Sequence, residues 1–317
     1  MTGPASASEQ GVVLHGTGGI WHVRTEGGID REASLRGRLK IESKQENALK
    51  LAVGDRVTIE PADSGPGWAI SEIHERRSSL SRRSPGSGRT ERVVAANVDQ
   101  VVVVFAMVKP EPHPRMLDRF LTIAEANDLA ARVVINKVDL ASEAAARAKF
   151  AAYEKAGYAM HYTSTKAQHG LVELRAALQD RVSVFSGPSG VGKSSLLNAL
   201  YPGLNLRVGE VSESVNKGRH TTVGAFMHPL PGGGYVVDTP GLREVGMWAI
   251  AASELDRCFP EIRALRDECR FADCTHRAEP ECAVREALSE GKLDRERYES
   301  YVKLREELEL AEEGQWG

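Results

Sequence analysis

The chain has 317 residues, of which 41% are hydrophobic and 27% are charged, a balance typical of folded globular proteins. It lacks the run of roughly 18 apolar residues that a transmembrane helix needs, and its four cysteines are too few for a disulfide scaffold. The first ten residues lack the basic and apolar parts of a secretory signal. We therefore expect a cytoplasmic protein that makes no membrane contact and acts as a monomer.

The N-terminal region has the pattern of a small β-barrel. Residues 1–10 are small and polar, and we expect a disordered tail there. Residues 11–75 hold five short strand-like runs separated by turn residues, which predicts a closed barrel of the oligonucleotide-binding type. An SH3-like barrel would give the same pattern. The expected strands are 11–16, 21–25, 34–40, 55–60 and 68–73.

Residues 76–97 differ sharply in composition, and we expect a basic linker. Between 76 and 92 there is one acid, Glu91, and no apolar period, so the segment is either a solvated linker or an RNA contact. Residues 286–313 hold ten acids and five bases. The two segments cancel in the net charge of -3, which therefore does not argue against an RNA partner. The bases of the first segment are Arg76, Arg77, Arg82, Arg83, Arg89 and Arg92.

Residues 98–249 alternate between buried strands and helices. The run VDQVVVVFAMV is almost wholly apolar, as expected for a strand covered on both faces of a parallel sheet. The alternation predicts an α/β domain with helices on both faces. The expected strands are 98–108, 132–140, 158–162 and 181–187, and the expected helices are 115–130, 142–156 and 170–179.

A phosphate-binding loop follows the strand at 181–187. Its glycines let backbone N–H groups curl around phosphates, Lys193 carries positive charge to the β- and γ-phosphates, and Ser194 ligates Mg²⁺. The alternative, a chance match in a glycine-rich turn, is disfavoured by the strand before the motif and the helix after it. The motif consists of Gly187, Pro188, Ser189, Gly190, Val191, Gly192, Lys193 and Ser194.

A guanine-specificity motif ends the strand at 132–140, where Asn136, Lys137, Val138 and Asp139 form NKxD. The Asp139 carboxylate can accept from both N1–H and the 2-amino group of guanine. Adenine offers neither donor, so it would leave a desolvated carboxylate unpaired. A polar turn after a strand is the alternative for the motif alone, but its pairing with a phosphate loop favours a GTPase.

Other segments match the switch motifs of GTPases. Asp238 begins DTPG after the strand YVVD, and we expect it to act on Mg²⁺ through water while the Gly241 N–H senses the γ-phosphate. In the loop GRHTT, either Thr221 or Thr222 would bind Mg²⁺ in the GTP state. Thr163 and Ser164 match the weak final base-contact motif.

The order of these motifs indicates a circular permutation, because NKVD precedes the phosphate loop and DTPG comes last. The segment after DTPG therefore leads into the C-terminal region, and we hypothesise that nucleotide state moves residues 250–317. Leu242 occupies the position of a water-orienting glutamine, so intrinsic hydrolysis should be slow. His220 is a candidate for positioning the water, although it is equally compatible with a solvated loop histidine.

Residues 250–317 are expected to form a helical zinc-binding domain. Cys269, Cys274, His276 and Cys282 supply three thiols and one imidazole, which suit a closed, structural tetrahedral Zn²⁺ site. Buried free cysteines beside a surface histidine are the alternative. Cys258 fits no ligand spacing and is expected in the core.

Together, these motifs resemble the ribosome small subunit-dependent GTPase A (RsgA/YjeQ) family over nearly the whole chain. The resemblance rests on the barrel, AANVDQVVVVFA, NKVD, GPSGVGKSSLLNAL, GRHTT, DTPG and the C-x4-C-x-H-x5-C spacing. It implies GTP hydrolysis stimulated by the small (30S) ribosomal subunit, a role late in its maturation, and rRNA binding by the barrel and zinc domain. It further implies guanine contacts at Asn136 to Asp139, phosphate contacts from Gly187 to Ser195, and GTP or GDP, Mg²⁺ and one Zn²⁺ as bound groups.

Two other functions remain compatible with the residues. A regulatory GTP-binding module with a protein target would need no RNA, and its binding should then depend little on salt. An ATP-using P-loop enzyme is disfavoured by Asp139.

Overall fold

The computed structural model describes residues 8–37, 39, 50–62, 66–83, 91–206, 225–238 and 250–313. The chain divides into two compact units, each treated by itself below. One contains residues 1–99, 178–184 and 203–241, and the other contains 100–177, 185–202 and 242–317. Within the described ranges, no helix has the length and apolar character needed to cross a membrane. The domain boundaries expected from sequence remain a prediction.

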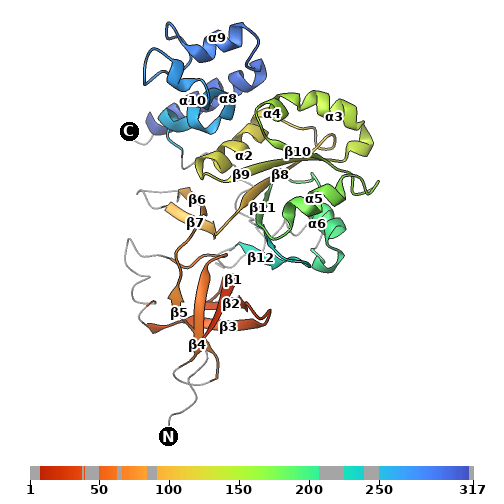
Figure 1. Ribbon diagram of the computed structural model, residues 1–317, viewed down its shortest axis with the longest axis vertical. Helices are drawn as coiled ribbons and strands as arrows, with labels where there is room; N and C mark the ends of the chain where they lie inside the picture. Colours follow the sequence, from red (N-terminus) through yellow and green to blue (C-terminus); the bar gives the residue numbers. More distant parts are fainter. Residues whose placement is uncertain are drawn as a thin grey trace. The chain divides into compact units, whose positions relative to one another are not determined.

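The N-terminal strands form a closed barrel in the order β1-β2-β3-β5-β4 (Figure 1). β3 pairs parallel with β5, and β1 closes antiparallel on β4. This closure is the one found in oligonucleotide-binding barrels, and it distinguishes the fold from an SH3-like barrel. Val13, Val23, Val57, Ile59 and Ile70 are fully buried inside it. The strands are β1 Glu9–Thr17, β2 Ile20–Thr25, β3 Asp30–Leu35, β4 Arg56–Pro61 and β5 Trp68–Ile73.

The third strand lies earlier than its expected position at 34–40. Within β3, Ala33 faces the core, while the guanidinium of Arg31 lies 4.6 Å from the centre of the Trp68 ring. Leu39, which suggested a strand, packs against the barrel core from a helical residue. Ala33 and Arg31 thus lie in a strand although neither gives a strong strand signal, because the side chains of neighbouring strands provide most of the apolar surface around them. β1 begins at Glu9, inside the expected tail.

The segment expected as a linker contains regular structure. β6 Ser79–Arg83 pairs antiparallel with β7 Glu91–Ala96. Leu80 is 1% exposed, and Ala95 and Ala96 are fully buried. Burial of these three apolar side chains stabilises the pair of strands. The arginine-rich composition concealed this pattern.

The strands of the central region form a six-stranded sheet in the order β10-β9-β8-β11-β13-β12. β8 pairs parallel with β9, and β9 with β10, as predicted, whereas β12 pairs antiparallel with β13 and adds a hairpin at one edge. Every residue of β8 is buried. The strands are β8 Gln100–Ala106, β9 Ala130–Asn136, β10 Ala159–Tyr162, β11 Val182–Ser186, β12 Phe226–Pro229 and β13 Tyr235–Asp238.

Helices cover strands β8, β9 and β10 on two sides. In Figure 1, α2, α3 and α4 lie above these strands, and α5 and α6 lie below them. The helix expected at 142–156 is interrupted at Phe150, which lies between α3 and α4. The Phe150 side chain is 1% exposed and is buried in the core. The helices are α2 Pro114–Ala126, α3 Glu143–Lys149, α4 Ala151–Lys155, α5 Leu171–Leu178 and α6 Lys193–Leu200, with short 3-10 turns at Val138–Leu140 and Pro202–Leu204.

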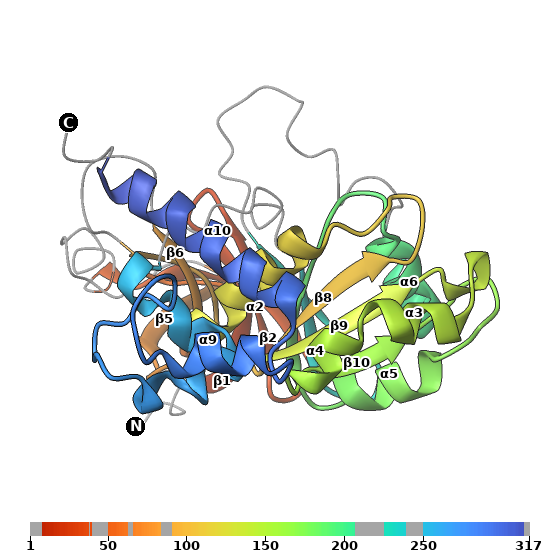
Figure 2. The same cartoon turned by 90° about the horizontal axis from the view of Figure 1, so that it is seen from above.

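The C-terminal region is helical, as expected. On α10, Tyr301, Leu304 and Leu308 are buried in its core with Cys258, and Tyr298 packs against them, so these residues form one apolar stripe along the helix. α10 also packs against α2, and Figure 2 shows it passing over that helix. The elements are η4 Ala252–Cys258, α8 Pro260–Arg263, η5 Arg266–Glu268, α9 Ala283–Ser289 and α10 Arg295–Glu313.

Candidate functional site

The phosphate loop joins β11 to α6 through a backbone that only glycine allows at two positions. Gly187 has φ 130°, and a Cβ there would lie 2.1 Å from the Val104 carbonyl oxygen. Gly192 has φ 95°, and its Cβ would lie 2.7 Å from Asn136 Nδ2. These approaches bring the loop close to β8 and β9. They leave a curved backbone at the start of α6 that suits an anion.

Lys193 and Ser194 occupy the first turn of α6. Lys193 Nζ donates to the carbonyls of Gly187 at 2.6 Å and Pro188 at 2.7 Å, so the ammonium lies within the curve of the loop. The Ser194 side chain is buried. The positive end of the helix and the ammonium together favour phosphate at this place.

NKVD lies at the end of β9, directly beside the phosphate loop. Asn136 is 1% exposed, and its Nδ2 donates to the Val191 carbonyl at 3.0 Å. Lys137, with φ 61°, donates through Nζ to the Gly190 carbonyl at 2.7 Å and also to the Lys109 carbonyl. The structure therefore brings together two predicted motifs that are about fifty residues apart in sequence.

The expected base-contact residues Thr163 and Ser164 lie against NKVD. Thr163 Oγ1 donates to Asn136 Oδ1 at 3.2 Å, and Ser164 Oγ donates to Asp139 Oδ1 at 2.6 Å. Both residues are fully buried, whereas Asp139 is exposed. Ser164 thus holds one oxygen of the Asp139 carboxylate, while the side chain remains exposed to solvent and accessible to a base. The weak sequence motif is brought to the same site as the strong one.

The switch residues are described only in part. Asp238 ends β13 and is half-buried, and its strand neighbour in β12 is Phe226. The other switch predictions concern His220, Thr221, Thr222, Gly241 and Leu242, which lie outside the described residues.

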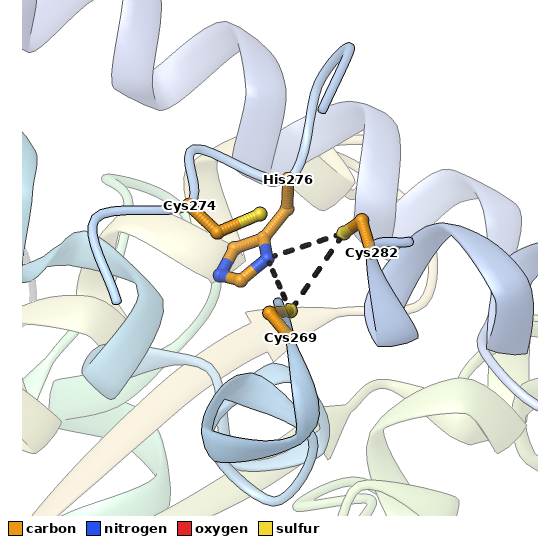
Figure 3. A group of neighbouring side chains, drawn as sticks. All are labelled: Cys269, Cys274, His276 and Cys282. Carbon is orange, nitrogen blue, oxygen red and sulfur yellow. Dashed lines mark hydrogen bonds between the residues drawn. The ribbon is translucent and has the colours of Figure 1, made fainter. Parts of the chain in front are cut away.

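The four predicted metal ligands converge in the C-terminal region (Figure 3). Their ligand atoms all lie within 4.8 Å of one another. His276 Nδ1 is 3.5 Å from the sulfurs of both Cys269 and Cys282, and these sulfurs are 3.9 Å apart. Tetrahedral zinc would separate sulfur from nitrogen by about 3.5 Å and sulfur from sulfur by about 3.8 Å. The measured edges fit that geometry, so the donor set and its spacing suit Zn²⁺.

Neighbouring groups orient this cluster. His276 Nε2 is 3.8 Å from Asp256 Oδ2, which is longer than a hydrogen bond but places a carboxylate beside the imidazole. Tyr298 donates from its hydroxyl to the His276 carbonyl at 2.8 Å. Sequence reasoning missed Asp256, because it lies among other polar residues in the turn Ala252–Cys258 and carries no local signal.

Glu279 supports the loop between the last two ligands. Its carboxylate accepts from the backbone N–H groups of Thr275 at 2.7 Å, Arg277 at 3.0 Å and Ala278 at 3.0 Å. Partial burial acts to raise the pKa of Glu279, but hydrogen bonds from Thr275 and from the backbone outweigh it and lower that pKa. The ionised carboxylate therefore stabilises the loop that carries His276.

Cys258 is placed in the core, as predicted. It is 4% exposed, and burial raises the pKa of its thiol to about 12. It is therefore a protonated, unreactive side chain.

Two arginines of the basic segment are committed to internal ion pairs. Arg76 pairs in two contacts of 2.7 and 2.8 Å with Asp55, a fully buried carboxylate that the sequence reading did not consider. Arg77 pairs with Asp99 at 3.3 Å. The charge count along the sequence therefore overstated the bases available to a partner.

Comparison with characterised families adds to this geometry. A family model described as RsgA GTPase matches residues 73–248. The chain is 60% identical over 304 residues to a protein of Gemmatimonas aurantiaca named small ribosomal subunit biogenesis GTPase RsgA, a match covering 96% of this chain and 98% of that protein. A protein of the same name from Moorella thermoacetica is 42% identical over 293 residues, covering 92% and 95% of the two chains.

Two solved structures are similar over almost the full length. The crystal structure of YjeQ from Thermotoga maritima has a TM-score of 0.78 and 35% identity, covering 95% of this chain and 99% of that one. The structure of YloQ, described as a circularly permuted GTPase, has a TM-score of 0.74 and 32% identity, covering 96% of each. The description of YloQ agrees with the permuted order of motifs along this chain.

Proposed function

Because this chain belongs to the RsgA GTPase family and is therefore a GTP hydrolase, we propose that it is a biogenesis factor for the small (30S) ribosomal subunit. It binds the subunit late in maturation, and the subunit stimulates its hydrolysis of GTP. The observation that carries the proposal is the near full-length similarity to proteins named small ribosomal subunit biogenesis GTPase RsgA. The hydrogen bond from Asn136 Nδ2 to the Val191 carbonyl supports a single site for base and phosphates.

In this proposal, guanine is read by the residues around Asp139. The carboxylate accepts from N1–H and the 2-amino group, while Ser164 holds it in place. Asn136 and Thr163 fix the strand end, and Lys137 packs over the base with its ammonium tied to the phosphate loop. Discrimination against adenine follows, because a bound adenine would remove water from this carboxylate and leave it without a donor.

The phosphates bind the loop from Gly187 to Ser195, including Pro188, Ser189, Gly190 and Val191. Lys193 neutralises charge that develops on the transferred phosphoryl group. Mg²⁺, when bound, neutralises charge on the β- and γ-phosphates, and the oxygens of Ser194 and Asp238 are donors of the kind it prefers. Gly241 would contact the γ-phosphate, Thr221 or Thr222 would bind the metal, and His220 would position water.

We also propose that Cys269, Cys274, His276 and Cys282 hold one structural Zn²⁺. Three thiolates and one imidazole leave no open coordination position, so the ion acts on folding rather than on catalysis. Its loss should loosen the loop that the cluster closes, because few large apolar residues lie within that loop.

The partners follow from the relatives and from the fold. The barrel and the C-terminal region bind rRNA, with the remaining arginines of the basic segment contributing charge. The protein acts in the cytoplasm as a monomer. Its domains are the barrel, whose first strand begins at Glu9, a basic connection at 76–97, the GTPase domain at 98–249 and the zinc domain at 250–317.

The test combines nucleotide specificity with binding to the subunit. Hydrolysis of GTP but not ATP, together with co-sedimentation with purified small subunits, supports the proposal. Retention of GTP hydrolysis without co-sedimentation would favour a regulatory module with a protein target. A preference for ATP would contradict the guanine assignment.

A further inference from the structure

A buried ion network joins α10 to α2. Arg297 is 3% exposed, and its guanidinium donates to Asp118 Oδ1 at 2.5 Å. It also donates from two nitrogens to both oxygens of Glu261 on α8, at 2.7 and 3.1 Å. Asp118 is 1% exposed. One cation therefore ties a helix of the GTPase domain to two helices of the C-terminal region.

Aromatic rings surround this cation. The guanidinium carbon lies 4.6 Å from the Phe259 ring centre, 5.1 Å from that of Tyr153 and 5.7 Å from that of Tyr158. A guanidinium in this setting is always charged, and its planar fork fits only one arrangement of carboxylates. The network therefore fixes α2 relative to α10, since a shift of either helix would leave a buried charge unpaired.

The network acts on the first turns of α2. Asp118 lies one turn after Pro114, whose carbonyl accepts from the Tyr153 hydroxyl at 3.3 Å. The loop at 107–113 precedes this turn and begins where the Met107 N–H donates to the Asn136 carbonyl at 2.8 Å. The position of α2 thus sets the position of this loop.

The same loop touches the predicted nucleotide site. The Lys109 carbonyl accepts from Lys137 Nζ, which also donates to the Gly190 carbonyl of the phosphate loop. Lys137 is consequently held between the 107–113 loop and the phosphate loop. A shift of the 107–113 loop would break the hydrogen bond between Lys137 Nζ and the Lys109 carbonyl.

We propose that Asp118 and Arg297 are positioning residues for guanine-nucleotide binding. Through α2 and the 107–113 loop they hold Lys137 in the geometry that retains the nucleotide. The inference rests on the proposed nucleotide site and goes beyond it, because it assigns a binding role to a contact made outside that site.

The loop that carries the predicted metal ligand His276 is hydrogen-bonded to α10 as well. Tyr298 and Tyr301 of α10 donate to the carbonyls of His276 at 2.8 Å and Thr275 at 3.1 Å. A change at the Cys–His cluster therefore reaches α2 through one helix. Coupling of this kind is reciprocal. If the metal-bound cluster strengthens nucleotide binding by some factor, bound nucleotide strengthens metal binding by the same factor.

The test uses an exposed contact between the same two helices, because truncating buried Arg297 could prevent folding. Arg119 on α2 pairs with Glu307 on α10. Glu307→Arg places two like charges together, and the double variant Arg119→Glu/Glu307→Arg restores the attraction. Glu290→Arg is the control, because Glu290 pairs at 2.6 Å with Lys292 inside the C-terminal region.

The readout is the dissociation rate of a fluorescent GDP analogue, together with kcat at saturating GTP. We expect Glu307→Arg to accelerate dissociation by about three- to tenfold with kcat within about twofold of wild type, and the double variant to restore the slow rate. Asp118→Asn should act in the same direction. Dissociation from both single variants at the wild-type rate would overturn the inference.

A second measurement separates this inference from the proposed function. Hydrogen exchange of residues 107–113 in nucleotide-free protein should be faster in Glu307→Arg than in Glu290→Arg. Wild-type protein that binds no guanine nucleotide would contradict the proposed function. If exchange at 107–113 is the same in Glu307→Arg and Glu290→Arg, the positioning role is contradicted even where the wild-type protein binds guanine nucleotide.

Discussion

Ser164 Oγ donates a 2.6 Å hydrogen bond to Asp139 Oδ1, so the loop after β10 holds the carboxylate that ends NKVD. Two segments that are 25 residues apart in sequence thereby become one base-reading surface. The predictions below begin with this contact and then move outward from the nucleotide site.

Asp139→Asn should change base preference. An amide offers a donor where guanine also offers donors, so GTP affinity should fall by about 100-fold or more, while xanthine nucleotides should bind better. Competition binding with GTP, XTP and ATP measures this. Ser164→Ala is the matched variant, and it should weaken GTP binding only several-fold without altering preference. A variant of Asp139 that still prefers guanine would remove this residue from base recognition.

Lys193→Met should nearly abolish turnover. The ammonium that now contacts the Gly187 and Pro188 carbonyls would no longer compensate phosphoryl charge, and loss of one such group costs about 10²- to 10³-fold in kcat. Lys149→Met, at an exposed position in the last turn of α3, is the control and should hydrolyse GTP normally. Equal rates in the two variants would show that Lys193 has no catalytic role.

Elemental analysis should find one zinc per chain in the wild type and in Cys258→Ala, but little in Cys274→Ser. The ligand variant should also melt at a lower temperature, since metal-binding energy contributes to folding. Asp256→Asn should retain zinc with about 10- to 100-fold weaker affinity, because it removes the carboxylate charge beside the His276 imidazole. Full zinc content in Cys274→Ser would argue for free thiols instead.

Stability should fall with acidification through two half-buried histidines, His15 and His228. Burial lowers the pKa of both His15 and His228 from the ordinary value of 6.5. Below about pH 6.5 the unfolded chain therefore takes up protons more readily than the folded one, and the free energy of unfolding decreases as pH falls from about 6.5 toward the lowered folded-state values.

The variant His15→Gln/His228→Gln tests this, with His113→Gln as the exposed control. Between about pH 7.5 and 5.5, the double variant should lose less thermal stability than the wild type. An identical pH dependence in wild type and double variant would assign the acid sensitivity to other groups.

The arginines of the basic segment should separate into two classes. Arg76→Ala should destabilise the fold by about 3–5 kcal/mol, because Asp55 is fully buried and would be left unpaired. Arg82→Ala/Arg83→Ala should instead weaken rRNA binding. The slope of log affinity against log salt should fall by about one for each arginine removed. RNA affinity that depends little on salt would favour a protein target.

The phosphate loop, NKVD and the Cys–His cluster were predictable, because chemistry fixes residue type and spacing within a short segment. Gly187 illustrates this, since its φ and its approach to Val104 leave no alternative residue. The apolar run of β8 was equally clear, as its burial on both faces determines its composition.

Long-range pairs were not predictable in the same way. Arg297 and Asp118 are 179 residues apart, and neither has a local signal that distinguishes it from a solvated charge. Arg76 was counted as a free base, but its role depends on Asp55 lying beneath it in the folded barrel. The third strand was misplaced for a related reason, since Ala33 belongs to a strand only because β2 and β5 flank it.

The central claim is that this chain is a GTPase whose activity the small ribosomal subunit stimulates. The most direct measurement is GTP turnover by the purified protein with and without purified small subunits. Slow intrinsic hydrolysis that rises by at least about tenfold with small subunits, and not with large subunits, is the predicted result. Turnover that is the same in the presence and absence of small subunits would contradict the account.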